Sequence, residues 1–138
     1  MGVSCREVSR TACLELLARA SIGRIILNPG SLPDVVPVSY CLAGETVVFG
    51  VPSGSRFPDE PEGAIASFQA DAFDTDRRCG WHVLAVGVFR TPVEPDEAAV
   101  AGAVVPEPWP TGEVAERVYS LEILALSGHV VESPDKPD

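Results

Sequence analysis

Long hydrophobic runs are absent from this sequence. No apolar stretch approaches the roughly 18 residues that a membrane-spanning helix needs. The polar first ten residues lack the apolar stretch of a secretory signal peptide, so we expect a cytoplasmic protein. Basic residues are scarce: 10 Lys and Arg against 20 Asp and Glu, a net charge of −10. Such an acidic chain is poorly suited to nucleic acid or to an anionic membrane surface, and we expect neither partner.

The four cysteines form no C-x-x-C motif, which excludes a zinc ribbon and a thioredoxin-type site. Cys79 and His82 form a C-x-x-H, which is either half of a metal site or a loop thiol beside a strand histidine. Zinc sites take four ligands, and His129 is the only other histidine. We therefore expect reduced thiols and no metal.

Several motifs of enzymes and metal sites are also missing. The chain has no G-x-S-x-G, no P-loop and no G-x-G-x-x-G, so nothing points to a hydrolase or a nucleotide-binding enzyme. The nearby Asp71, Asp74 and Asp76 lack the glycine and the terminal glutamate of an EF-hand. We interpret them as a solvated acidic turn.

What remains is a chain of 138 residues with 46% hydrophobic residues, enough for one core. We expect a single domain over residues 1–131 and a disordered tail over 132–138. An apolar stripe at i, i+3, i+4 and i+7 from Cys13 to Ala20 predicts a helix over residues 9–20 with Ser9 as its N-cap. Alternatively, Ser4 and Glu7 form a capping box and the helix begins earlier.

The rest of the chain indicates short strands separated by turns, and so a mainly β barrel or sandwich. Pro37 inside a strand implies an edge or a bulge, and Gly87 marks a bend or bulge. A short helix over 96–104 precedes the last strand. The predicted strands cover residues 25–27, 35–40, 46–51, 64–70, 81–90 and 117–126, the last with a possible continuation to 131.

The order of these segments resembles the pyridoxamine-phosphate-oxidase-like split barrel, over roughly residues 9–130. That resemblance implies a six-stranded antiparallel split β-barrel with an N-terminal helix and a short helix before the last strand. The segments that carry it are Cys13-Leu14-Glu15-Leu16-Leu17, Ile22-Gly23-Arg24-Ile25, Pro37-Val38-Ser39-Tyr40, Val47-Val48-Phe49, Ser53-Gly54-Ser55-Arg56, Ala66-Ser67-Phe68, Gly80-Trp81-His82-Val83-Leu84 and Pro108-Trp109.

The resemblance also implies a flavin held in a cleft between the two subunits of a homodimer. In the family, one basic residue on the third strand and another on the following loop hold its phosphate. Arg56, beside Ser55, matches the loop position, but Gly50 stands where the strand arginine is usual. Loss of that charge would cost about 1.5–3 kcal/mol of binding free energy.

Other site residues follow from the same resemblance, each with an alternative interpretation. Arg56 is otherwise a solvated loop arginine, and Tyr40 a core residue. His82 is either a proton donor to substrate or an exposed strand histidine, and Trp109 covers either the cofactor or the barrel end. The residues expected to contact the cofactor are Pro37, Val38, Ser39, Tyr40, Phe49, Ser55, Arg56, Trp81, His82 and Trp109.

The sequence therefore predicts an FMN-dependent oxidoreductase that acts on an unknown small molecule, with no residue singled out as catalytic. One alternative is a deazaflavin-binding reductase. Another is a non-enzymatic dimer that binds a ligand and has lost flavin, which Gly50 and His82 favour. The valines expected at the dimer interface are Val36, Val38, Val86 and Val88.

Overall fold

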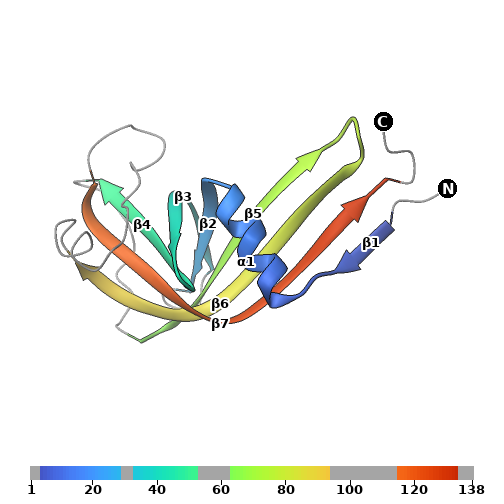
Figure 1. Cartoon of the computed structure of the whole chain (residues 1–138). Helices are drawn as coiled ribbons and strands as arrows, with labels where there is room; N and C mark the ends of the chain where they lie inside the picture. The colour runs from blue at the N-terminus through green and yellow to red at the C-terminus, as the bar shows by residue number, and fades with distance from the viewer. Residues whose placement is uncertain (1–3, 29–32, 53–62, 94–114, 134–138) are drawn as a thin grey trace.

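The computed structural model describes residues 4–28, 33–52, 63–93 and 115–133. No helix among these residues is long and apolar enough to span a membrane. The elements, labelled in Figure 1, are β1 (Ser4–Glu7), α1 (Arg10–Arg19), β2 (Ile22–Leu27), β3 (Asp34–Ala43), β4 (Thr46–Pro52), β5 (Ile65–Asp74), β6 (Cys79–Val93) and β7 (Ala115–Glu132).

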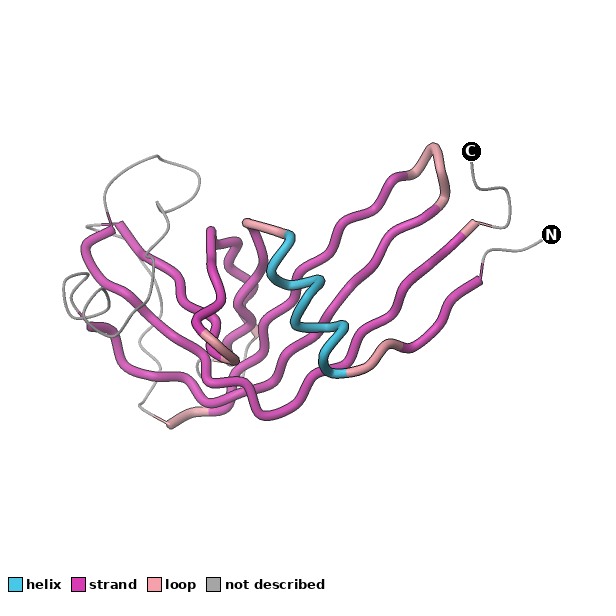
Figure 2. The backbone as a smooth tube through the Cα atoms, in the orientation of Figure 1, coloured by secondary structure: helices cyan, strands magenta, loops and turns pink. Residues whose placement is uncertain are grey.

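Six of the strands close into an antiparallel barrel in the order β7-β4-β3-β2-β5-β6, with β6 pairing back onto β7. This confirms the predicted fold. β1 is an additional strand that pairs with the C-terminal end of β7. The outer halves of β5, β6 and β7, together with β1, extend beyond the barrel as an arm (Figure 1). α1 packs against β3, β6 and β7, where the arm meets the barrel (Figure 2).

The helix begins as predicted. Ser9 has an extended backbone, and its hydroxyl accepts a hydrogen bond from the Ala12 N–H at 3.2 Å. Cys13, Leu16 and Leu17 form the buried face of α1. The alternative capping box of Ser4 and Glu7 is wrong, because these residues belong to β1. All four residues of β1 are exposed, so no alternation of apolar and polar side chains indicated a strand.

Large aromatic side chains fill the barrel, with Phe49, Phe68 and Phe89 fully buried. Strand residues alternate between this core and the outer face of the sheet, which corrects part of the expected dimer interface. Val38 is buried and Val36 is partly buried against the core, so both side chains point toward the barrel interior. Val35, on the outward side of that strand, is 57% exposed.

β6 and β7 are longer than the sequence suggested. The register between these two strands shifts between Val86 and Gly87, where the sequence predicted a bend or bulge. Leu124 is the extra residue on β7 at this bulge. A Cβ atom at Gly87 would lie 2.2 Å from the Glu122 carbonyl oxygen, so only glycine fits there. β7 continues to Glu132, which therefore does not belong to the expected tail. The helix predicted over 96–104 lies outside the described residues.

Candidate functional site

β3 and β4 separate within the segment expected to bind the cofactor. The two strands pair from Ala43 opposite Thr46 up to Tyr40 opposite Phe49. The next pair would be Ser39 with Gly50, and the described residues do not form it. Beyond this point β3 follows β2, while β4 follows β7.

Backbone polar groups converge at this separation. The Tyr40 N–H donates to the Ser21 carbonyl oxygen at 3.0 Å, on the β2 side of β3. Because successive residues of an antiparallel strand direct their N–H and C=O groups to opposite sides, those of Ser39 point toward β4. By the same alternation, those of Gly50 point toward β3. Pro37, also on the β4 side, has no N–H to leave unpaired, which explains why this strand accepts proline.

The larger side chains expected at the cofactor point into the core instead. Tyr40 is 4% exposed, and its hydroxyl donates to the Leu17 carbonyl oxygen at 2.5 Å. Burial raises the pKa of Tyr40 well above its ordinary value. Phe49 stacks on Tyr119 with ring centroids 5.8 Å apart. With Val38 also buried, these residues reach a ligand only through their backbone, whereas Pro37 and Ser39 face outward.

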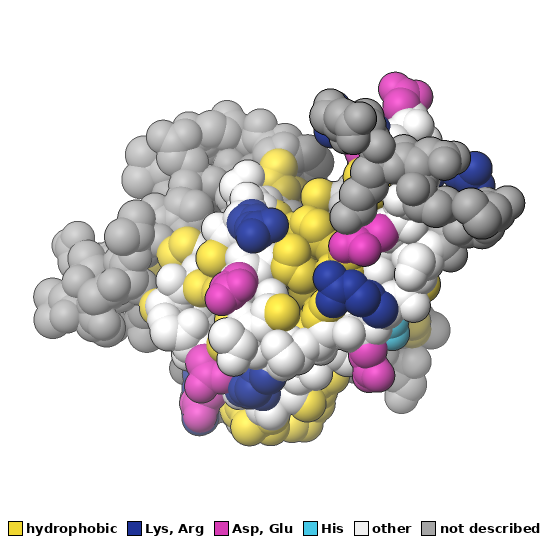
Figure 3. Space-filling view, turned by 45° about the vertical axis from the view of Figure 1, so that its right-hand side comes forward, with side chains coloured by type: hydrophobic (Ala, Val, Ile, Leu, Met, Phe, Trp, Pro, Cys, Tyr) yellow, Lys and Arg dark blue, Asp and Glu magenta, His cyan; other side chains and the backbone are white. Residues whose placement is uncertain are grey.

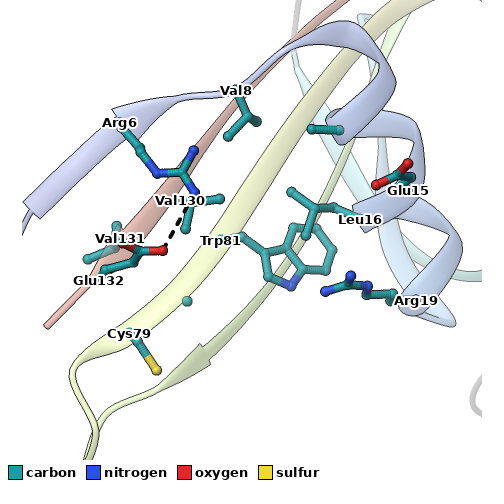
Figure 4. Close-up of a pocket in the computed structure, with 12 residues that line it drawn as sticks. Arg6, Val8, Glu15, Leu16, Arg19, Cys79, Trp81, Val130, Val131 and Glu132 are labelled. Carbon is teal, nitrogen blue, oxygen red and sulfur yellow. Dashed lines mark ion pairs between the residues drawn. The ribbon is translucent and has the colours of Figure 1, made fainter. Parts of the chain in front are cut away.

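Trp81 forms one wall of a separate pocket of about 510 Å³ between α1, β1 and the starting end of β6 (Figure 4). Leu16 and Val130 lie beside the indole, and an ion pair between Arg6 and Glu132, 3.5 Å long, borders the far side. Apolar side chains gather in the middle of the face shown in Figure 3, with charged groups of both signs around them.

His82 lies on the opposite face of the sheet from Trp81, as consecutive strand residues must. Its Nε2 atom is 3.2 Å from Nδ1 of His129, directly opposite on β7. On its other side, His82 is opposite Asp71 of β5, whose carboxylate accepts hydrogen bonds from Arg24 and Gln69. No local pattern indicated the histidine pair, because its members are 47 residues apart in the chain.

One chain therefore does not bring the expected residues together. Along β7, Gly50 is opposite Val118, whereas Trp81 and His82 are opposite Val130 and His129 near the other end of that strand, so the separation of β3 and β4 is apart from both residues. Ser55, Arg56 and Trp109 lie outside the described residues. The expected C-x-x-H is also divided, because Cys79 lines the pocket with Trp81, away from His82.

A family model described as pyridoxamine 5'-phosphate oxidase matches residues 9–130. The chain belongs to this family. One relative of this chain is an uncharacterized protein of Mycobacterium tuberculosis, which is 26% identical to it over 98 residues. The aligned residues are 67% of this chain and 64% of the relative. The chain thus spans less than two thirds of that relative's length.

Two solved structures show the same fold as this family member. An FAD binding protein from Mycobacterium smegmatis has a TM-score of 0.72 at 23% identity. The superposition covers 92% of this chain and 98% of that protein's chain. An FAD-binding protein from Mesorhizobium loti has a TM-score of 0.71 at 17% identity. That superposition covers 96% of this chain and 100% of the other protein's chain.

Proposed function

We propose that this chain binds a flavin where β3 and β4 separate and, as a homodimer, uses it in redox chemistry on a small organic molecule. The observation that carries the proposal is the convergence of the Ser39 and Gly50 backbone groups at the point where the ladder opens. Family membership and the two FAD-binding proteins of the same fold favour a flavin over an unrelated ligand.

The residues at the separation fit the polar edge of a flavin ring. The Ser39 N–H and hydroxyl are donors, the carbonyls of Pro37 and Ser39 are acceptors, and Gly50 lets the ligand approach the backbone closely. Arg56, four residues beyond Pro52, supplies the charge for a phosphate. When bound, the flavin supplies hydride or electron transfer, and the protein orients it and excludes water.

The homodimer completes the site in this proposal. Trp81 cannot join Ser39 within one chain, so an indole beside the flavin comes from the partner subunit. The outer face of the sheet supplies apolar side chains for the contact: Val35 and Ile65 are 57% and 62% exposed. Exposed apolar side chains on this outer face favour an interface there.

A titration of the purified full chain with FMN and with FAD, followed by quenching of flavin fluorescence, tests the site. Ser39→Pro removes the N–H that faces the separation, which the β2 ladder does not use, together with the hydroxyl. We expect it to weaken flavin binding about five- to tenfold, the value of one neutral hydrogen bond. Ser39→Ala keeps the N–H and is the matched control for loss of the hydroxyl.

Arg56→Ala tests the phosphate anchor, and we expect it to abolish most of the binding. Arg77→Ala, in the turn between β5 and β6, removes the same charge away from the site and should bind like the wild type. Equal affinity of Arg56→Ala and the wild type would mean that the phosphate lies elsewhere. If neither flavin binds any variant, binding of a deazaflavin separates the deazaflavin reductase from a flavin-free ligand-binding dimer.

A further inference from the structure

A row of four ionisable residues crosses the arm on the outer face of the sheet. Glu7 of β1 is opposite His129 of β7, His129 is opposite His82 of β6, and His82 is opposite Asp71 of β5. Residues directly opposite each other on antiparallel strands project to the same face with Cβ atoms about 5 Å apart. Two imidazoles are therefore flanked by a carboxylate at each end.

The two imidazoles have the spacing of a chelating pair. The Nε2 atom of His82 and the Nδ1 atom of His129 are 3.2 Å apart, and the rings are stacked within 17° of parallel. Zinc binds imidazole nitrogen at about 2.0–2.1 Å. If an ion lay at that distance from both nitrogens, the nitrogen–ion–nitrogen angle would be roughly 103°, close to the tetrahedral value of about 109°. The two nitrogens, which share a hydrogen bond in this structure, are therefore already at the separation that an ion requires.

The surrounding charges favour a cation. Asp71, opposite His82 on β5, accepts a hydrogen bond from Gln69 Nε2 at 2.9 Å, and Arg24, 3.5 Å away, offsets part of its charge. Glu7 adds a second, exposed carboxylate on the other side. His82 and His129 are both half-buried, and histidine reaches the surface at the right of the face shown in Figure 3.

We propose that His82 and His129 bind a divalent transition-metal ion, such as Zn²⁺, Ni²⁺ or Cu²⁺. Imidazole nitrogen suits these ions, whereas Mg²⁺ and Ca²⁺ prefer oxygen ligands. Among the described residues no group of three or more His, Cys, Asp and Glu gathers closely enough to enclose an ion. The remaining positions are therefore filled by water or by a small ligand. This revises the expectation of no metal, and it is independent of flavin binding.

Calorimetric titration of the full chain with Ni²⁺ and Zn²⁺ tests the site. We expect one ion per chain for the wild type and no binding of Mg²⁺ or Ca²⁺. His82→Gln and His129→Gln should each weaken binding at least tenfold, since even indirect partners of a metal ligand contribute about 10–100-fold. The double variant should not bind. Melting curves without metal check that each variant is folded.

Cys5→Ser is the matched control, because Cys5 lies on the same face as Glu7 in β1 and is the nearest exposed thiol. It should bind metal like the wild type. In this background, a Cu²⁺ electron paramagnetic resonance spectrum should show coupling to imidazole nitrogens, a readout that does not depend on a histidine variant folding. A copper signal without nitrogen coupling, or undiminished binding by the double histidine variant, would overturn the proposal.

Discussion

Tyr40 joins the end of α1 to the barrel, and its replacement by phenylalanine should be costly. The Leu17 carbonyl that accepts its hydroxyl is among the last four of the helix, which have no partner within the helix. Tyr40→Phe keeps the buried ring, which packs edge-on against Phe68 with ring centroids 4.7 Å apart. It removes the hydroxyl and so leaves the Leu17 carbonyl without this hydrogen bond. Such a loss costs about 1–3 kcal/mol of unfolding free energy. For a domain of this size, each kcal/mol corresponds to about 3–5 °C in Tm.

The same side chain gives the stability a pH dependence of known sign. Because burial raises the pKa of Tyr40, its contribution is fully present below the ordinary tyrosine pKa of about 10 and is lost as the pH rises above it. The difference in unfolding free energy between wild type and Tyr40→Phe should therefore stay constant up to about pH 10 and narrow above it. Urea unfolding followed by circular dichroism measures it, with Tyr119→Phe as the control for the other tyrosine. A Tyr40→Phe variant within about 0.5 kcal/mol of wild type at pH 8 would refute the reasoning.

Three further substitutions test the fold and the site. Ser9→Ala removes the N-cap of α1 and should cost about 1 kcal/mol in urea unfolding, whereas Ser9→Asn should cost little. Gly23→Ala places a Cβ atom 2.2 Å from Cζ of Phe68 and 2.9 Å from the Gln69 carbonyl oxygen, so we expect about 1–3 kcal/mol of destabilisation; an unchanged melting temperature would contradict that packing. Gly50→Arg restores the charge usual on the third strand and should tighten flavin binding; unchanged affinity would place the phosphate elsewhere.

Local patterns of the sequence were sufficient for the barrel strands and for the start of the helix. The apolar stripe after Ser9 and the turns between β-branched segments act over a few residues, and both were confirmed. β1 was missed because a strand exposed on both faces carries no hydrophobic alternation. The interface valines Val36 and Val38 were assigned to the wrong face, since a shift of one residue reverses every side chain of a strand.

The candidate site was harder to predict because it depends on pairing between distant strands. The separation at Ser39 and Gly50 is a place where a ladder stops, and no local motif encodes that. The pair of His82 and His129 depends on the register of β6 and β7, whose extra residue at Leu124 lies between them and the barrel. Register is set by the whole sheet, so proximity of these residues could not be read from their spacing in the chain.

The positions of Trp81 and Ser39 lead to a final prediction about the assembly. Gly50, across from Ser39, is opposite Val118 on β7, whereas Trp81 is opposite Val130 near the other end of that strand, so we expect a flavin in contact with both sites to lie between two chains. Flavin affinity should then depend on protein concentration. It should be weaker at protein concentrations below the dimer dissociation constant, because the monomer retains Ser39 and loses the partner's indole. Light scattering gives the oligomeric state, and flavin titrations above and below the dissociation constant give the affinities. Equal affinity for monomer and dimer would show that a single chain holds the flavin and that Trp81 serves only the pocket beneath α1.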